Sequence, residues 1–394
     1  MMEQNFAIAA EWVFLALIAT VISIRLGISV ALIEIAVGVV GGNAMHIEIT
    51  SWVNFLAGFG AVVLTFLAGA EINPDSLKDN MKESLAIGFF SFLLPFLAGM
   101  AFAYYGFGWS INASKIAGIA LSTTSVAVVY AVMVETGLAS SRLGQGILAA
   151  CFVTDLGTVL ALGLLFTGFS MKVVWFTGIM IVAVLLISPI AARVFKWYGG
   201  RVSEPEIKFI FLVLLALAYL AVISGSEAVL PAYIIGMAMA RFFLQYKETL
   251  HKMRAIVFAV FTPFYFIKAG ALVSVSALYT MSGAIMIFLI IKVAAKFIGV
   301  LPVTRFFRYD SRTGIYTTLL MSTGLTFGSI SALYGLANNH IDANQYSVLI
   351  AAVILSAVIP TVIAQKWFFP LWAERENYVE NEEKLVERGA EHGN

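Results

Sequence analysis

The stretch 146-GILAACFVTDLGTVLALGLL-165 contains twenty residues and a single charged side chain, Asp155. A run this apolar is typical of a membrane-spanning helix, because about 20 residues at 1.5 Å per residue cover a hydrocarbon core of roughly 30 Å. An aspartate in the middle of such a helix costs on the order of 2.5–3.5 kcal/mol to insert. A side chain this unfavourable in lipid indicates a functional site within the membrane.

The rest of the chain has the same apolar character. Hydrophobic residues make up 61% of its 394 residues and charged residues only 12%, whereas a soluble domain is about one-quarter charged. The composition therefore indicates a polytopic membrane protein. A net charge of +1, one cysteine and four scattered histidines give no sign of nucleic-acid binding, a disulfide framework or a metal site. The sequence also lacks a phosphate-binding glycine loop and a nucleophile elbow, so we expect no cofactor and no enzyme chemistry.

Apolar runs separated by charged residues, proline or glycine predict thirteen membrane spans. The N-terminal run lacks a basic region and a small-residue cleavage site, so we interpret it as the first span rather than a signal peptide. The spans are expected near residues 6–24, 27–45, 52–71, 84–106, 114–135, 143–167, 172–193, 207–223, 228–245, 255–279, 281–302, 313–337 and 345–369.

The distribution of basic residues orients these spans. With the N-terminus outside, nineteen lysines and arginines fall in inner loops and the tail, and only Lys115 and Lys172 fall in outer loops. This is the asymmetry that the positive-inside rule requires. We expect residues 1–372 to form a transmembrane region in the cytoplasmic (inner) membrane. Residues 373–394 are expected to form a short charged cytoplasmic tail.

The odd number of spans allows an inverted repeat. Spans 1–6 then correspond to spans 8–13, and the shift of seven spans reverses the orientation of each span in the membrane. Such inverted repeats are typical of transporters, which often have interrupted helices at corresponding positions of the two repeats. Span 5 contains 121-LSTTSVAVV-129 and span 12 contains 321-MSTGLTFGS-329, and these two spans are seven apart. Either segment alone is also compatible with a small-residue packing face on a continuous helix. Their matching positions favour two broken helices.

Other charged residues also fall inside the predicted spans. Lys292 and Lys296 are four residues apart and share one helix face; the remaining ones are Glu34, Glu227 and Lys268. Glu71 and Glu135 lie near span ends, where a carboxylate reaches the headgroup region, so we set them aside. Buried charges of this kind serve either as ion pairs that hold helices together or as a titrating ion site.

Two arguments favour an ion site at Asp155. It lies one span after the first predicted break, where half-helix ends supply dipoles and neutral oxygens. Hydroxyl oxygens suited to Na⁺ or K⁺ come from Thr154, Thr123, Thr124 and Ser125. Burial favours the protonated form of a carboxyl group, whereas a bound cation favours the carboxylate. A proton and a cation would therefore compete for one side chain, which is sufficient for exchange if the site opens to one side at a time.

Six segments carry a resemblance to a known family. They are 29-SVALIEIAVGVVGG-42, 66-FLAGAEINPDSLK-78, 122-STTSVAVVYAVMVETG-137, 149-AACFVTDLGTVLALG-163, 226-SEAVLPAYIIGMAMA-240 and 261-FTPFYFIKAGALVSV-275. In this order they resemble the bacterial monovalent cation:proton antiporters, the group of sodium/proton exchangers and potassium-efflux antiporters. The resemblance implies an all-α fold with two crossing broken helices. It also implies a core over about 84–167 and 281–369, a scaffold formed by the remainder, a homodimer and an elevator-like movement.

The resemblance also assigns roles to individual residues. In the family, span 6 carries a pair whose second member is an aspartate that binds ion or proton, here Asp155, while Thr154 occupies the first position. Lys296 in "AAKFIG" best matches the lysine that pairs with the first position, and Lys292 is the alternative. Threonine at 154 deprives that lysine of its usual partner. Lys268 departs from the family pattern; it could replace a neutralising charge or pair with Glu34 or Glu227.

One acidic residue at the site implies one proton per cation, and so electroneutral exchange. The short tail implies that the nucleotide-binding domain of some potassium-efflux relatives is absent. Two alternatives stay open: a sodium-coupled symporter of a small organic solute on the same fold, and a non-transporting sensor or channel-like protein. No span shows a polar constellation for an organic substrate beyond the ion site, so antiport is the preferred interpretation.

Overall fold

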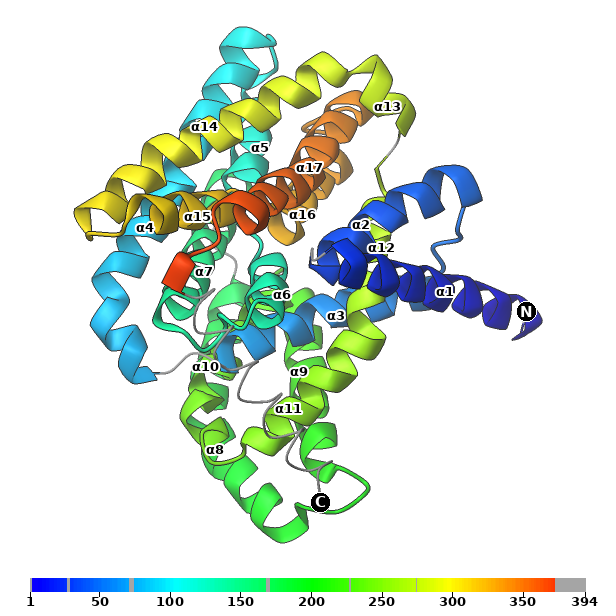
Figure 1. Ribbon diagram of the computed structural model, residues 1–394, viewed down its shortest axis with the longest axis vertical. Coiled ribbons are helices and arrows are strands. Elements are labelled where there is room, and N and C mark those ends of the chain that lie inside the picture. Colours follow the sequence, from blue (N-terminus) through cyan, green and yellow to red (C-terminus); the bar gives the residue numbers. More distant parts are fainter. Residues whose placement is uncertain are drawn as a thin grey trace, which may run out of the picture.

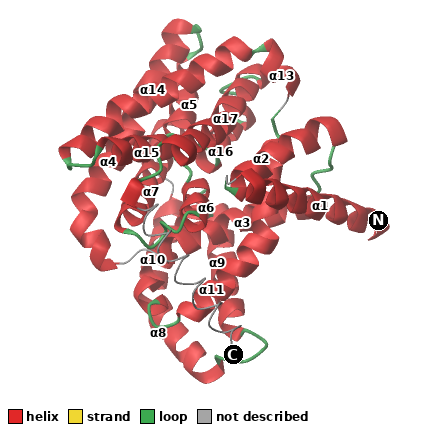
Figure 2. Cartoon of the chain, viewed as in Figure 1, coloured by secondary structure: helices red, strands yellow, loops and turns green. Residues whose placement is uncertain are grey.

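The computed structural model describes residues 2–26, 29–70, 74–167, 171–226, 228–273 and 275–372. Throughout these residues the regular secondary structure is helical (Figure 2). The first eight helices are α1 (Met2–Leu26), α2 (Val30–Val40), α3 (Ser51–Ala70), α4 (Pro74–Ala101), α5 (Ile111–Ser122), α6 (Val126–Glu135), α7 (Arg142–Leu162) and α8 (Met171–Tyr198). The others are α9 (Pro205–Ile223), α10 (Val229–Phe243), α11 (Lys247–Ile256), α12 (Thr262–Ala271), α13 (Val275–Thr280), α14 (Ser282–Phe306), α15 (Ser311–Met321), α16 (Thr326–Ala337) and α17 (Ala343–Trp367).

Thirteen apolar helical runs correspond to the thirteen predicted spans. Within the described residues, eleven runs are long and apolar enough to cross a membrane, and two shorter ones, Val30–Met45 and Val229–Phe243, complete the set. The run Val30–Met45 consists of α2 and a π-helical turn, Gly41–Met45, that continues it. The prediction of an all-α membrane protein with about thirteen spans is confirmed.

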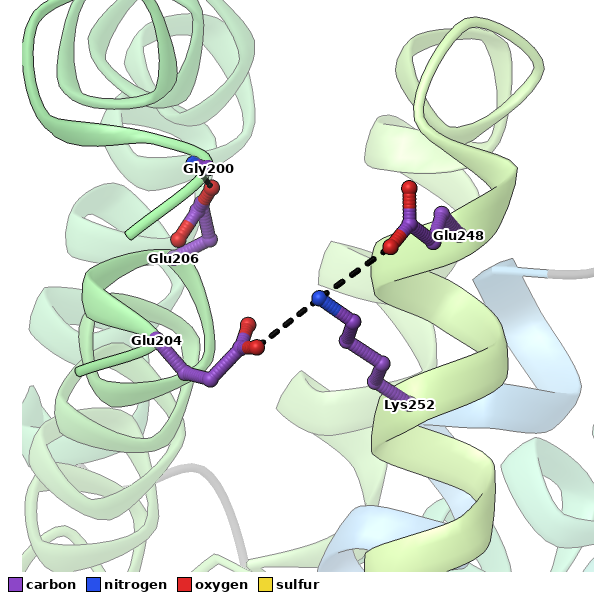
Figure 3. Close-up of polar contacts among 5 residues, drawn as sticks. All are labelled: Gly200, Glu204, Glu206, Glu248 and Lys252. Carbon is purple, nitrogen blue, oxygen red and sulfur yellow. Dashed lines mark hydrogen bonds and ion pairs between the residues drawn. The ribbon is translucent and has the colours of Figure 1, made fainter. Parts of the chain in front are cut away.

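The tenth span is the clearest error in the predicted boundaries. It was expected at 255–279, but the helical run extends from Lys247 to Ala271, through α11, a π-helical turn and α12. The basic residues of α11 look like loop residues in the sequence. In the structure Lys252 Nζ instead bonds Glu204 Oε1 at 2.8 Å and Glu248 Oε1 at 3.2 Å, which ties α11 to the start of α9 (Figure 3).

The helices pack as two bundles that occupy different parts of the molecule (Figure 1). We call α4–α7 with α14–α17 the broken-helix bundle, and α1–α3 with α8–α12 the outer bundle. Within the broken-helix bundle, α4 packs on α5 and α7 just as α14 packs on α15 and α17. Equivalent packing by helices seven spans apart is the expected inverted repeat. Contacts between the bundles are sparser and run chiefly from α3 to α6.

The outer bundle is held by close backbone contacts at glycines. A Cβ atom at Gly270 of α12 would overlap the backbone carbonyl of Ile35 in α2. Likewise, a Cβ atom at Gly236 of α10 would overlap the carbonyl of Phe66 in α3. Small residues allow this approach in membranes, where van der Waals packing between helices provides much of the association energy. The glycine contacts therefore fix these helix pairs against each other.

Both predicted helix breaks are present. Residues 123–125 separate α5 from α6, and residues 322–325 separate α15 from α16. At the first break Thr123 has an extended backbone (φ −65°, ψ 151°), and Ser125 caps α6 by accepting a hydrogen bond from the Val128 N–H at 3.4 Å. Four half-helix ends consequently meet in the middle of the broken-helix bundle.

Candidate functional site

The two broken helices cross and are hydrogen-bonded to each other at their breaks. Thr124 Oγ1 donates to the Met321 carbonyl at 2.8 Å. The Ser125 N–H donates to the Thr323 carbonyl at 3.2 Å, and the Ser125 hydroxyl lies 3.5 Å from that of Thr326. Backbone groups released by one break are thus satisfied by the other, as buried polar groups require.

Asp155 is buried next to this crossing with an unsatisfied carboxyl oxygen. Its side chain, on α7, is 4% exposed, and Oδ1 has no hydrogen-bond partner. Thr154 does not satisfy it, because the Thr154 hydroxyl donates to the Cys151 carbonyl of its own helix at 2.7 Å. An ionised carboxylate in such a place is strongly unfavourable unless it binds a proton or a cation. The geometry therefore leaves Asp155 available to a ligand.

Lys296 donates hydrogen bonds to three neutral oxygens rather than to a carboxylate. From α14, its Nζ donates to Ser91 Oγ at 2.8 Å, to the Ser122 carbonyl at 2.9 Å and to Thr124 Oγ1 at 2.9 Å. These three bonds use all three N–H groups of an ammonium. Ser122 ends α5, where the negative end of the helix dipole also favours a cation. Lys296 and Asp155 form no ion pair within the described part of the chain.

Lys292 lies at the second break and is differently placed. It is fully buried, and its Nζ has no hydrogen-bond partner. A Cβ atom at Gly324 would overlap Lys292 Nζ, and it would lie 3.1 Å from Ser356 Oγ and 3.2 Å from Thr123 Oγ1. The amine thus occupies the space that glycine leaves at the break. Lys296 therefore lies at the first break and Lys292 at the second. One helix turn separates the two lysines on α14, so each can reach a different break.

The predicted hydroxyl ligands divide among these surroundings. Thr124 Oγ1 accepts a hydrogen bond from Lys296, and the Ser125 hydroxyl lies next to that of Thr326. Thr123 Oγ1 lies near Gly324, as does Lys292 Nζ. Among the described side chains, no hydrogen bond joins any of these hydroxyls or Thr154 to Asp155. The structure brings the predicted residues to one crossing but does not arrange them as a closed cage around the carboxylate.

Two polar residues at the crossing were not identified from the sequence. Ser91 of α4 accepts from Lys296, and it appeared in the sequence only as a small residue in an apolar span. Tyr265 of α12 hydrogen-bonds Thr326 Oγ1 across the boundary between the bundles. Tyr265 belongs to the segment 261–275, in which Lys268 is the charged residue. A tyrosine in mid-span, which needs a partner for its hydroxyl, was the available signal.

The two described supporting charges, Lys268 and Glu34, form no hydrogen bond or ion pair with this centre. Lys268 of α12 forms no ion pair with Glu34, one of the alternatives that the sequence leaves open. The alternative partner, Glu227, lies outside the described residues. Glu34 is buried in α2 and instead shares a cavity with Glu135, one of the two carboxylates set aside as span-end residues.

The chain is similar to one family of proteins over most of its length. The family described as "Sodium/hydrogen exchanger, transmembrane" matches residues 13–369. The probable Na⁺/H⁺ antiporter 3 of Methanocaldococcus jannaschii is 26% identical over 358 residues, which cover 86% of this chain and 89% of that protein. The Na⁺/H⁺-K⁺ antiporter GerN of Bacillus cereus is 25% identical over 353 residues, covering 86% and 89% of the two chains.

The fold is also found among solved structures. The sodium proton antiporter MjNhaP1 of Methanocaldococcus jannaschii superposes with a TM-score of 0.68 at 15% identity, covering 93% of this chain and 100% of that one. An electron-microscopy structure of the same antiporter gives a TM-score of 0.73 at 16% identity, covering 93% and 96%. At these identities the likeness establishes the shared fold.

Proposed function

The chain belongs to the sodium/hydrogen exchanger family, and on that premise we propose that it exchanges protons for a monovalent cation by alternating access, with Asp155 as the shared site. The observation that carries this proposal is the buried, unsatisfied carboxyl oxygen of Asp155 beside two crossing broken helices. Na⁺ is the first candidate because the matched relatives are named as Na⁺/H⁺ antiporters, and K⁺ is the second because GerN is named for both.

Competition at Asp155 gives the exchange. Desolvation makes the bare carboxylate unfavourable, so the side chain carries either a proton or a cation when the site is closed to water. The cation takes hard oxygen ligands from the carboxylate, the nearby hydroxyls of the crossing and water. A bound proton and a bound cation each neutralise the Asp155 carboxylate. The protonated core and the cation-loaded core can therefore both move through an apolar environment.

Lys296 acts in this proposal as a positioning residue. Its three hydrogen bonds fix α14, α4 and the first break relative to one another, and they persist whether Asp155 holds a proton or a cation. Since Thr154 supplies no second carboxylate, one proton is exchanged for one cation. The proposed exchange is therefore electroneutral.

The packing supports movement of one bundle against the other. Each bundle is tightly packed internally, whereas the contacts between them are sparser. The broken-helix bundle corresponds to the core expected over 84–167 and 281–369, and the outer bundle to the scaffold, within which we also place the contacts of a homodimer. The hydrogen bond between Tyr265 and Thr326 crosses the boundary and must break when the core moves.

The protein is a multi-pass membrane protein, which we place in the cytoplasmic membrane with the N-terminus outside and the C-terminus inside. The nineteen-to-two distribution of basic residues supports this orientation.

Reconstitution tests the function directly. Proteoliposomes with an imposed proton gradient and an internal pH dye should lose the gradient after addition of Na⁺ or K⁺ salts, and not after addition of choline. An undisturbed gradient with every monovalent cation would refute antiport. Movement that requires an organic solute together with Na⁺ would identify the symporter instead.

A further inference from the structure

A second group of carboxylates lies away from Asp155, in a cavity between the two bundles. The cavity has a volume of about 930 Å³ and opens where α1 ends and α2 begins, which is the cytoplasmic side in the proposed orientation. Its described lining includes Glu34 of the outer bundle and Glu135 of the broken-helix bundle, but no lysine, arginine or histidine. The charged side chains of the described lining are therefore both acidic, which favours a positively charged ligand.

Glu34 is a buried carboxylate in this cavity with one unsatisfied oxygen. It is 2% exposed, and its Oε2 has no hydrogen-bond partner. The nearest basic residues on the elements packed against α2 are Arg25 of α1, Lys268 of α12 and Lys366 of α17, and none of them forms an ion pair with it. A buried carboxylate is costly unless a proton or a cation neutralises it, and the described residues supply no partner for Glu34 Oε2.

Glu135 is held in place beside Glu34 by the start of α2. Its Oε2 accepts a hydrogen bond from the Val30 N–H at 2.9 Å, at the positive end of the helix. Val30 and Glu34 are four residues apart and share one face of α2. The two carboxylates consequently lie within electrostatic range of each other, and the hydroxyl-bearing Ser29 lines the same cavity.

We propose that Glu34 and Glu135 bind a second monovalent cation, Na⁺ in the first instance, in the cavity between the bundles. Carboxylate and hydroxyl oxygens are hard ligands of the kind that alkali cations take. A divalent cation such as Ca²⁺ takes 6–8 oxygens with several carboxylates, whereas Glu135 already shares its charge with the helix N-terminus. The cation bridges the two bundles, so the site exists only while Glu34 and Glu135 face each other.

The test removes the Asp155 site first. Equilibrium binding of ²²Na⁺ to purified Asp155→Asn protein should remain saturable, since the Glu34 site is intact. In the double variant Asp155→Asn/Glu34→Gln the affinity should fall by ~10-fold or more, equivalent to about 1.4 kcal/mol. Glu206→Gln in the same Asp155→Asn background is the matched control, because Glu206 is a buried carboxylate of the outer bundle that does not line this cavity, and its Oε1 accepts the Gly200 N–H at 2.7 Å (Figure 3).

The outcomes decide the proposal independently of transport. Absence of saturable ²²Na⁺ binding by Asp155→Asn protein, or binding that survives Glu34→Gln, would overturn it. Displacement of the bound ²²Na⁺ by micromolar Ca²⁺ would show a divalent site and also overturn it. Glu135→Gln provides a second variant if Glu34→Gln fails to fold. Failure of the wild-type protein to exchange ions would refute the proposed function and leave this binding result standing.

Discussion

Gly324 allows a sharp test of the second helix break. Its φ is not in the left-handed region, so the backbone accepts alanine and only the space around it opposes the substitution. The new Cβ atom would overlap Lys292 Nζ and press on Ser356 Oγ and Thr123 Oγ1 at 3.1 and 3.2 Å. We predict that Gly324→Ala lowers the free energy of unfolding by about 1–3 kcal/mol, the usual cost of overpacking a core.

The clash partner can be removed to check this cause. Methionine is shorter than lysine and has no atom at the Nζ position, so Lys292→Met vacates the overlapped space. In the Lys292→Met background Gly324→Ala should be close to neutral, because only the contacts with Ser356 Oγ and Thr123 Oγ1 remain and the loss of unfolded-state entropy offsets them. The resulting coupling energy is about 1–3 kcal/mol, above the ~0.5 kcal/mol expected for independent sites.

Thermal denaturation of the detergent-purified variants measures these changes. Gly58→Ala in α3 is the matched control, because nothing lies within 4 Å of a Cβ atom at that position, and alanine is the better helix former. The reasoning would be refuted by a Gly324→Ala protein as stable as the wild type, or by equal destabilisation with and without Lys292.

Three further predictions concern other parts of the protein. Lys296→Gln should lower stability by about 1–3 kcal/mol, because buried oxygens lose a charged hydrogen-bond donor, yet leave measurable exchange in liposomes; complete loss of exchange with unchanged melting would make Lys296 a proton carrier. Exchange should be insensitive to valinomycin-clamped potassium-diffusion potentials with Na⁺ as the exchanged ion, whereas Thr154→Asp should introduce voltage dependence; voltage-dependent wild-type exchange would contradict the one-for-one count. Partial burial raises the pKa of Asp310, but hydrogen bonds from Thr313 and neighbouring backbone groups outweigh it and leave the pKa below its ordinary value. This stabilisation is present at neutral pH and is lost as the pH falls through the lowered pKa, so in urea titrations Asp310→Ala should cost about 1 kcal/mol at pH 7 and less as the pH is lowered into the acid range.

The sequence predicts most of the fold because membrane insertion constrains it so strongly. Span length, the odd span count and the two polar interruptions follow from hydrophobicity and chain order alone. Asp155 is conspicuous for the same reason, since a single charge in a twenty-residue apolar run must be paired, protonated or bound to an ion. These features are local, and local features are visible in a sequence.

The details of the site depend on which helices cross, and the sequence does not contain that information in readable form. Ser91 looks like a small packing residue until α14 places Lys296 beside it. Glu135 looks like a span-end carboxylate until the start of α2 is placed against the end of α6. The sequence leaves open whether Lys268 pairs with Glu34, and the structure shows no ion pair between them.

The most direct test of the central claim compares Asp155→Asn with the wild-type protein in proteoliposomes. Asn has the same shape and is cheaper to bury, so the variant should fold and melt normally while losing cation-driven proton movement. Asp310→Asn is the matched control, because asparagine also caps helices, and it should retain exchange. The account predicts wild-type and Asp310→Asn exchange with none from Asp155→Asn; robust exchange by well-folded Asp155→Asn protein would contradict it.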